Sequence, residues 1–468
     1  MAWAEPHLLV ERNPGEWRLA LIEGGRLEGL VIARDHEPQR MGDILLGRVR
    51  AHVAAIRASF VAIGDAEDGF LPWQDARWLR PDRDAERVPE TLPEGTAILV
   101  QVTRDAEGTK GARLTADISL DGRLLVWLPR GDGIRASKRL GDDTGQRRLT
   151  EFLAGLGMGG GFVLRTAAEG ADTAELDREA RTLARDWAEI EARAAHATAP
   201  ALVARRGGGL AGALAAIGWN AGDRVTVDSD ATAAALLAIE PEAAPEICRA
   251  ADGPLEMEGA AVEIDALLGS DVPLPGGGRL IIEQTAALTA IDVDSGTASG
   301  TAARASVNLA AAREIPRQLS LRNIGGVAIA DFILDRDRTP GEAVLRALRQ
   351  GFEADPARPH LAGVTPSGLV EIVRRRTGPS LADRLLGAPG RRPTAETDAL
   401  AALAEIRRLL RAEPGFRPAL RLPRAGALAL SGPLAPALQE LEAALHSPLP
   451  VSADAALDRG WIIERKQG

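Results

Sequence analysis

Short runs of alternating apolar and polar residues predict β-strands in the first quarter of the chain. Residues 7 to 33 alternate in this way and are interrupted by turn signals at residues 13–15 and 24–25, which predicts a three-stranded meander. More short apolar runs follow between residues 42 and 120, each bounded by glycine, aspartate or proline. Because short strands at such regular spacing are typical of closed sheets, they predict a small barrel.

Helical periodicity appears in the middle of the chain. Residues 147–156 and 173–197 have apolar residues at helical spacing and flank a strand-like run at residues 160–170, which predicts a separate α+β unit. Residues 201–268 mix helix and strand patterns.

A sharper pattern follows the proline- and glycine-rich stretch DVPLPGGGR. It predicts strands at residues 279–283, 288–293 and 327–334 and a helix at residues 303–320. A linker rich in proline, glycine and arginine then leads to a helix at residues 398–412 and a short tail domain. The chain therefore reads as a multidomain α+β protein.

Length and composition limit the class of protein. A chain of 468 residues is too long for one ordinary core, so two or more compact units are expected. Its hydrophobic content of 45%, charged content of 26% and mean hydropathy of -0.07 are typical of a soluble globular protein. No run is apolar enough to predict a membrane span, and the first seven residues do not resemble an export signal, so a cytoplasmic location is expected.

Charge and cysteine content narrow the candidate chemistry. The formal net charge of -10 argues against a general polyanion binder, although local arginine clusters can override it. Cys248 is the only cysteine and the six histidines are scattered, so a disulfide framework and a Cys/His zinc site within one chain are not expected. Any metal ion is expected to be held by oxygen ligands.

Two predicted strands in the second half of the chain end on aspartate. One contains Asp292 and Asp294 in the stretch AIDVDSG, and the other contains Asp331 in VAIADFI. If these strands are neighbours, Asp292 and Asp331 lie at one sheet edge and can share a hydrated Mg²⁺, which prefers oxygen ligands. The alternative is that the acids only cap the turns that follow. The residues alone leave both interpretations open.

Two further groups of residues are candidates for contact with nucleic acid or phosphate. Phe60 and Phe70 lie on short strands of the predicted barrel, which also contains Lys110. Aromatic side chains beside cations can hold single-stranded nucleic acid. With seven phenylalanines and no tyrosine in the chain, the residues alone favour the barrel core for both rings. Arg165 and Thr166 end a strand and suit a phosphate group, although a surface salt bridge is the commoner role.

Six stretches, taken in order, resemble the catalytic part of the ribonuclease E and ribonuclease G family of bacterial endoribonucleases. They are GDILLGRVRAHVAAIRASFVAIGDAEDGFLPWQDA, GTKGARLTADISLDGRLLVWLP, GFVLRTAAEG, LIIEQTAALTAIDVDSG, NLAAAREIPRQLSLRNIGGVAIADFI and GLVEIVRRRTGPSL. The resemblance covers about the whole chain, and six collinear matches are far more specific than any one of them.

The resemblance implies five subdomains. They are an RNase H-like subdomain (residues 1–33 and 207–268), an OB-type RNA-binding barrel (34–116), a 5′-sensor subdomain (117–206), a DNase I-like catalytic subdomain (269–386) and, after a linker at 387–397, a small C-terminal domain (398–468).

The resemblance also implies roles for single residues. Asp292 and Asp331 match the two magnesium ligands, and Asp294 stands where ribonuclease E-type sequences have an asparagine that supports the site. Phe60, Phe70 and Lys110 match the RNA-contacting positions of the family's barrel. The resemblance therefore reverses the interpretation of the two phenylalanines as core residues. The pocket for a 5′-monophosphate is matched by Gly122, Val126, Lys138, Arg165, Thr166 and Arg358, with Lys138 in place of an arginine.

One departure from the family concerns its zinc link. Family members typically carry a short Cys-Pro-x-Cys segment that shares a zinc ion between two protomers, and this chain reads LLGAPGRRPTAET there. Zinc is therefore not expected, whereas a homodimer through the tail domain stays open. The chain ends at Gly468 without the long scaffold of ribonuclease E proteins, which favours the compact ribonuclease G type.

The expected function is that of a magnesium-dependent endoribonuclease. It would cleave single-stranded RNA, such as rRNA precursors and mRNA, to products with a 5′-phosphate and a 3′-hydroxyl, in RNA processing and decay. Two alternatives remain: a catalytically impaired RNA-binding paralogue of the same family, and a structural barrel protein with no nucleic-acid role.

Overall fold

The computed structural model describes residues 6–37, 40–80, 82–106, 110–122, 124–136, 144–165, 168, 170–206, 208–219, 222–297, 299–333, 340–353, 355, 357–387 and 392–465. The chain divides into two compact units. The first comprises Met1–Glu37 and Gly209–Gly468, and the second comprises Pro38–Gly208. Helices and strands are mixed in both units, so the α+β class predicted from the sequence is confirmed.

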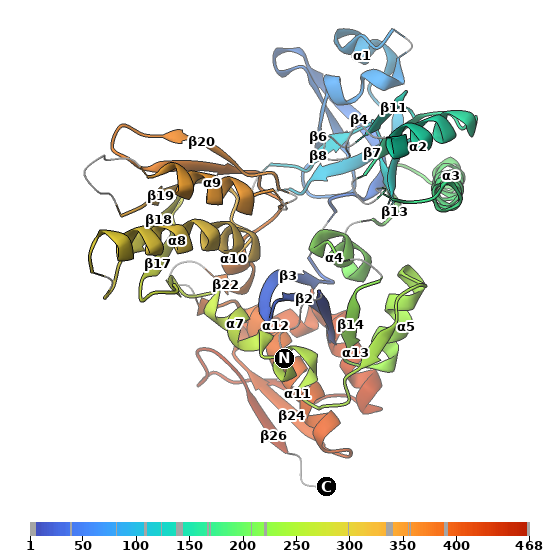
Figure 1. The fold of residues 1–468 in the computed structure, drawn as a ribbon. Coiled ribbons are helices and arrows are strands. Elements are labelled where there is room, and N and C mark those ends of the chain that lie inside the picture. The colour runs from blue at the N-terminus through green and yellow to red at the C-terminus, as the bar shows by residue number, and fades with distance from the viewer. Residues whose placement is uncertain are drawn as a thin grey trace. The chain divides into compact units, whose positions relative to one another are not determined.

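In the first unit, strands from residues 7–34 and from residues 224–247 form one five-stranded sheet (Figure 1). Its order is β15 (Pro245–Ile247), β14 (Arg224–Val227), β1 (His7–Asn13), β2 (Glu16–Glu23) and β3 (Arg26–Arg34). The predicted meander is thus present as β1 to β3, and β1 pairs in parallel with β14.

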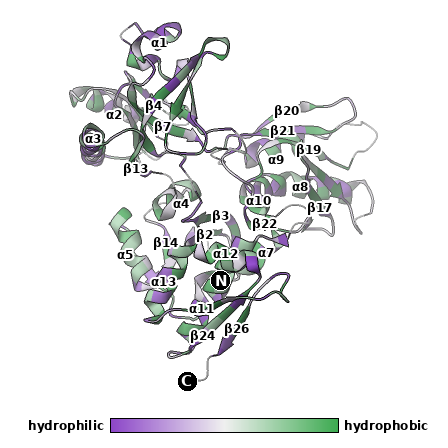
Figure 2. Cartoon of the chain, turned by 180° about the vertical axis from the view of Figure 1, so that it is seen from behind, coloured by the Kyte–Doolittle hydropathy of each residue, from purple (hydrophilic) through white to green (hydrophobic). Residues whose placement is uncertain are grey.

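Helices cover both faces of this sheet. Apolar residues of α4 (Gly209–Ile217) and α5 (Asp230–Ile239) pack on one face, and those of α6 (Gly253–Met257) and α7 (Ala260–Ala266) pack on the other. Figure 2 shows the mostly apolar character of α5. Because successive strand residues alternate between faces, Leu8 and Leu9 belong to different cores.

A six-stranded sheet in the same unit is covered on one face by two helices. Its order is β16 (Asp271–Pro273), β17 (Arg279–Gln284), β18 (Thr289–Asp294), β19 (Gly326–Asp331), β21 (Val370–Arg374) and β20 (His360–Val364). Helices α8 (Thr301–Leu321) and α9 (Glu342–Gly351) share a core with this sheet. Strands β18 and β19 are parallel, and α8 makes the crossover between them.

The rest of the first unit is a small helical layer with a three-stranded sheet. It contains α11 (Ala395–Ala412), β24 (Pro418–Leu422), α12 (Arg424–Ser431), α13 (Ala435–Leu445), β25 (Val451–Ala453) and β26 (Ile462–Arg465). Before it, α10 (Leu381–Leu385) packs in a core of the five-stranded sheet, and β22 (Leu386–Gly387) pairs with β23 (Arg392–Pro393). Helix α11 starts three residues before its predicted first residue because the Thr394 side chain caps it and accepts a hydrogen bond from the Thr397 N–H at 3.0 Å.

The second unit contains the closed barrel that the sequence predicts. Strands β4 (Ile44–Val53), β5 (Ala58–Ala62), β6 (Gly69–Pro72), β8 (Arg113–Thr115) and β7 (Ala97–Arg104) follow one another around it. Pairing of β4 with β7 closes the ring, and β13 (Ala201–Ala204) extends it beside β4. Short helical turns η1 (Ala54–Ile56), η2 (Trp73–Asp75), η3 (Arg77–Leu79), η4 (Ala85–Arg87) and α1 (Val88–Thr91) lie in its loops.

A second sheet completes this unit. Its order is β11 (Ile134–Ala136), β12 (Gly161–Leu164), β10 (Leu125–Leu128) and β9 (Leu120–Asp121), and it packs with α2 (Thr144–Gly155) and α3 (Thr173–His196). Helix α3 begins with a capping box made by Asp172 and Glu175. Among the described residues, no helix is long and apolar enough to cross a membrane.

Candidate functional site

Asp292 and Asp331 lie side by side at the ends of two parallel strands. The register of β18 and β19 places Asp292 directly opposite Asp331. The neighbouring residues Ile291 and Ala330 are buried under α8 and α9, so the two aspartates project from the opposite, uncovered face of the sheet. The sequence predicted the two strand ends, and the parallel crossover through α8 brings them together.

The two carboxylates repel each other. Partial burial raises the pKa of Asp292, and the negative charges of Asp331 and Asp294 raise it further, while Arg279 acts weakly in the opposite direction. A divalent cation between Asp292 and Asp331 would relieve this repulsion. The donors are carboxylate oxygens, which suit a hard ion such as Mg²⁺.

The pair is not a complete ligand set. Within the described ranges, no three side chains of His, Cys, Asp or Glu come together in a way that could hold a metal ion. Mg²⁺ typically keeps several waters and uses one or two carboxylates together with substrate phosphate oxygens. Two exposed aspartates at a sheet edge fit that mode of binding.

Asp294 has a different environment from Asp292, although both lie on β18. Its carboxylate accepts hydrogen bonds from the Arg279 Nε at 3.0 Å and from the Gly296 N–H at 2.9 Å. These two contacts, the backbone one first, lower the pKa of Asp294. Asp294 therefore caps the turn, as one interpretation of the sequence held, and Arg279 offsets its charge.

Asn308 of α8 holds the chain just beyond Asp331, and no role was predicted for it from the sequence. Its Nδ2 donates to the Ile333 carbonyl at 2.7 Å, and its Oδ1 accepts from the Ile333 N–H at 3.0 Å. The side chain is 8% exposed. The role of Asn308 could have been predicted from its position among the apolar residues of a buried helix face, because a buried amide needs hydrogen-bond partners.

Phe60 and Phe70 lie together on the barrel but outside its core. They are cross-strand partners on β5 and β6, with ring centroids 6.0 Å apart and an interplanar angle of 68°. Both are half-buried, whereas their neighbours Val61 and Leu71 fill the barrel core. The interpretation of the rings as core residues is wrong for this barrel.

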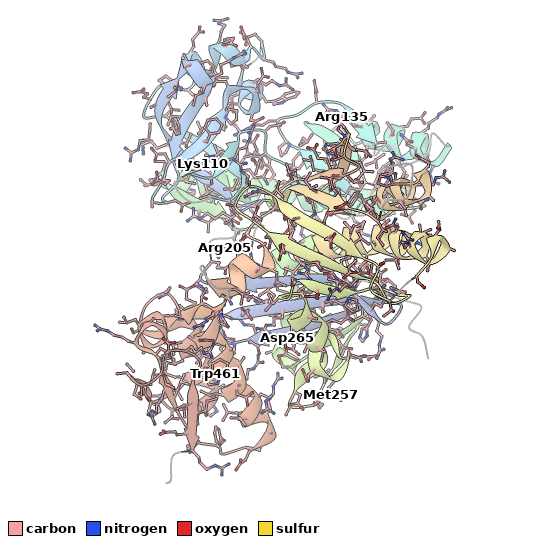
Figure 3. All side chains as sticks on the ribbon, turned by 90° about the vertical axis from the view of Figure 1, so that its left-hand side faces the viewer. Lys110, Arg135, Arg205, Met257, Asp265 and Trp461 are labelled. Atoms are coloured by element: carbon pink, nitrogen blue, oxygen red, sulfur yellow. The ribbon has the colours of Figure 1, made fainter. Side chains whose placement is uncertain are left out.

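Lys110 is exposed on the barrel (Figure 3). The chain passes very close to the loop before β6 here, since a Cβ on Gly111 would lie 2.0 Å from the carbonyl oxygen of Asp68. The Phe70 N–H donates to the Ala112 carbonyl at 2.7 Å, which ties this segment to the strand of Phe70. The backbone thus brings a cation to the strand that bears one of the two rings.

Gly122 directly follows β9, and Val126 lies on β10. The Glu179 carboxylate of α3 accepts hydrogen bonds from the backbone N–H groups of Leu124 and Leu125, at 2.9 Å and 3.0 Å. A Cβ on Gly122 would lie 2.0 Å from an oxygen of that carboxylate and 2.9 Å from the Leu125 carbonyl oxygen, so a larger residue here would displace the Glu179 side chain. Val126 is half-buried on β10.

Arg165 follows β12 and is paired with an acid. Its Nη2 donates to the Asp121 Oδ1 at 2.6 Å, and the two side chains are 42% and 61% exposed. A phosphate that binds Arg165 must therefore compete with Asp121. The predicted sensor residues Lys138 and Thr166 lie outside the described residues.

Arg358, the last predicted sensor residue, belongs to the first unit. It is exposed, with a left-handed backbone at φ 52°. The turn before it is fixed by Asp355, whose carboxylate accepts from the Arg374 Nε at 2.7 Å and from the Ala357 N–H at 2.8 Å. A buried ion pair thus presents an exposed arginine.

Comparison with known proteins identifies the family that this chain resembles. The model of the ribonuclease E/G family matches residues 119–377. Ribonuclease G of Escherichia coli is 34% identical over 396 residues, which cover 80% of each chain. Ribonuclease G of Salmonella typhimurium is 33% identical over 463 residues, covering 93% of this chain and 94% of that one. Ribonuclease E of a Nostoc species is 35% identical over 384 residues, covering 77% of this chain and 55% of the relative.

Proposed function

The chain belongs to the ribonuclease E/G family, and we propose that it is a magnesium-dependent endoribonuclease acting on single-stranded RNA. The observation that carries the proposal is the pairing of Asp292 with Asp331 on neighbouring parallel strands, where both acids face away from the core. In the cell the enzyme takes part in RNA processing and decay in the cytoplasm, with rRNA precursors and mRNA as substrates.

In this proposal, Asp292 and Asp331 hold one divalent cation through their carboxylate oxygens. When bound, Mg²⁺ supplies positive charge that stabilises the negative charge developing on the scissile phosphate. Asp294 keeps Arg279 beside the site, and Asn308 fixes the chain that follows Asp331. Water adds to the phosphorus and the bond to the 3′-oxygen breaks, so the products carry a 5′-phosphate and a 3′-hydroxyl.

The second unit holds the substrate in this proposal. The half-buried rings of Phe60 and Phe70 stack on RNA bases, and the Lys110 ammonium group pairs with a phosphate. Gly122, Val126 and Arg165 select a 5′-monophosphate, and Lys138 and Thr166 are assigned to the same role by resemblance to the family. The resemblance also assigns a 5′-phosphate contact to Arg358, which belongs to the first unit.

The sheets support the predicted subdivision of the chain. We assign the five-stranded sheet to the RNase H-like subdomain, the closed barrel to the OB-type RNA-binding barrel and the four-stranded sheet to the 5′-sensor subdomain. We assign the six-stranded sheet to the DNase I-like catalytic subdomain and the three-stranded sheet to the small C-terminal domain.

A homodimer through the small C-terminal domain is tested by light scattering with and without a metal chelator.

Cleavage of a short 5′-monophosphorylated RNA tests the proposal. Asp292→Asn and Asp331→Asn should each lower the rate at least on the order of a hundredfold, since the loss of several kcal/mol of charge stabilisation has that effect. RNA binding should change little, and the wild-type products should accept ligation at their 5′-phosphate ends. Undiminished cleavage by both variants would refute the assignment, and tight binding without cleavage by the wild type would favour the impaired paralogue.

A further inference from the structure

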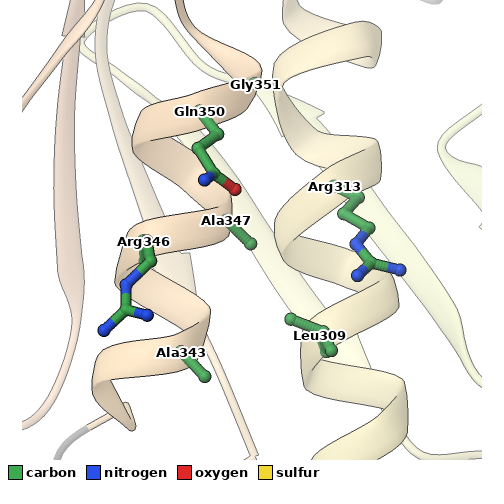
Figure 4. A pocket seen from close by; sticks show the side chains of 7 residues that line it. All are labelled: Leu309, Arg313, Ala343, Arg346, Ala347, Gln350 and Gly351. Carbon is green, nitrogen blue, oxygen red and sulfur yellow. The ribbon is translucent and has the colours of Figure 1, made fainter.

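A groove lies between α8 and α9, on the helical side of the six-stranded sheet. Its volume is about 330 Å³, and the residues that line it are Leu309, Arg313, Ala343, Arg346, Ala347, Gln350 and Gly351. Figure 4 shows Leu309 and Arg313 on α8 and the other side chains on α9, with Ala347 directed toward α8 and the guanidinium groups of Arg313 and Arg346 on opposite sides of the groove. Small and apolar residues form the floor, and polar side chains form the rim.

The groove ends where the two helices touch. A Cβ on Gly351 would lie 2.6 Å from the Cγ of Pro316, so the helix backbones approach as closely as glycine permits. Both walls are anchored by the core below them, because Ala312 and Ile315 of α8 and Val344 and Leu348 of α9 are buried. The groove is therefore a fixed feature of the packed subdomain.

The two arginines of the rim have no acidic partner among the described residues, and the acids of the two helices are engaged elsewhere. Glu314, the only acid of α8, pairs with Arg26 and Arg317. Glu342, the only acid of α9, pairs with Arg349. Arg313 and Arg346 are exposed, and two like charges beside one groove attract an anion.

We propose that this groove binds a nucleoside monophosphate or a phosphorylated ligand of similar size. The guanidinium groups of Arg313 and Arg346 stand on opposite rims of the groove, and each is suited to a phosphate, since planar donors bind it through charge-assisted hydrogen bonds. Leu309 and Ala347 offer an apolar floor to a base, and the Gln350 amide can both donate and accept at its edge. The volume is at the lower end of the range for small-molecule sites, which suits one nucleotide.

This site is separate from the predicted cleavage site. Asp292 and Asp331 project from the uncovered face of the sheet, while α8 and α9 pack on the other face. A ligand in the groove would not displace RNA from the two carboxylates. Its binding can therefore be measured whether or not the chain cleaves RNA.

Calorimetric titration of the purified full-length chain tests the proposal. The ligands are adenosine 5′-monophosphate, inorganic phosphate and adenosine, and Arg165→Ser is introduced first so that the proposed 5′-phosphate pocket does not contribute. The nucleotide should bind more tightly than phosphate alone, and adenosine should bind weakest. Equal binding of phosphate and nucleotide would overturn the nucleotide assignment.

Substitutions in the groove identify the site. Arg313→Ser with Arg346→Ser should weaken nucleotide binding at least on the order of tenfold, because hydrogen bonds to charged groups are lost. Ala343→Trp should also abolish binding, by filling the groove without removing a charge. The control Arg349→Ser changes an arginine of α9 that pairs with Glu342, and it should bind like the parent.

Two further results would overturn the proposal. One is nucleotide binding that survives both the double arginine substitution and Ala343→Trp. The other is the absence of mononucleotide binding. If an arginine-dependent affinity for a 5′-hydroxyl oligoribonucleotide accompanies that absence, the groove is a track for polynucleotide phosphates.

Discussion

Replacing Asn308 by alanine removes the two hydrogen bonds that hold the Ile333 backbone, two residues beyond Asp331. Both bonds are short, at 2.7 Å and 3.0 Å, and the amide is almost fully buried. A hydrogen bond of this kind contributes about 1 kcal/mol net, so the pair contributes about 2 kcal/mol. If the whole loss falls on the arrangement that binds metal, the apparent Mg²⁺ affinity drops roughly thirtyfold.

The assay measures cleavage rate against Mg²⁺ concentration, together with the free energy of unfolding in urea. Gln318→Ala is the matched control, because Gln318 lies on the same helix, is 3% exposed and exchanges hydrogen bonds with Glu314 and Arg322. Both variants should lose stability. Only Asn308→Ala should shift the Mg²⁺ concentration for half-maximal cleavage, and excess Mg²⁺ should restore part of its rate.

An equal Mg²⁺ requirement for the two variants would refute this reasoning. Asn308 would then stabilise the fold without positioning Asp331. Asn308→Asp refines the test, since an aspartate can still accept from the Ile333 N–H but, when ionised, cannot donate to its carbonyl. An intermediate shift is expected for that variant.

Three further predictions concern other carboxylates. Asp294→Asn keeps an oxygen for the turn but loses the ion pair with Arg279, so cleavage should change less than about tenfold in a rate assay; a complete loss would make Asp294 a metal ligand. Asp121→Ser frees Arg165 from an exposed ion pair of at most about 1 kcal/mol, so the preference for 5′-monophosphorylated over 5′-hydroxyl RNA should rise up to about fivefold; an unchanged ratio would remove Arg165 from the sensor. Burial raises the pKa of Glu11 from 4.5 to about 7, so its stabilising effect is complete below pH 4.5 and is lost as the pH rises through 7. Glu11→Gln should remove up to about 3 kcal/mol of this pH dependence from urea unfolding curves, and identical curves would contradict the raised pKa.

The local elements could be predicted because their signals are local. The meander of β1 to β3 follows from alternation and two turns, and α8 follows from helical spacing. Boundaries shifted by a few residues where side chains cap an element, as Thr394 does for α11. The pairing of β1 with β14 joins residues more than two hundred positions apart, and no local pattern encodes it.

The site could be predicted only in part, because its geometry depends on contacts between strands that are distant in sequence. The sequence marked Asp292 and Asp331 as strand ends, but their register depends on the parallel crossover of α8. It could not separate the roles of Asp292 and Asp294, since that difference comes from Arg279 on the neighbouring strand β17. The partial exposure of Phe60 depends on which face of β5 turns inward, which the resemblance indicated and the composition did not.

The central claim is that Asp292 and Asp331 hold one metal ion together. Calorimetric titration of Mg²⁺ into the wild type, Asp292→Asn, Asp331→Asn and the double variant tests it most directly. If the two carboxylates share one ion, either single substitution should abolish most of the binding, and the double variant should lose little more. Binding that is unchanged in both single variants, or that falls by independent and additive amounts, would contradict a shared site.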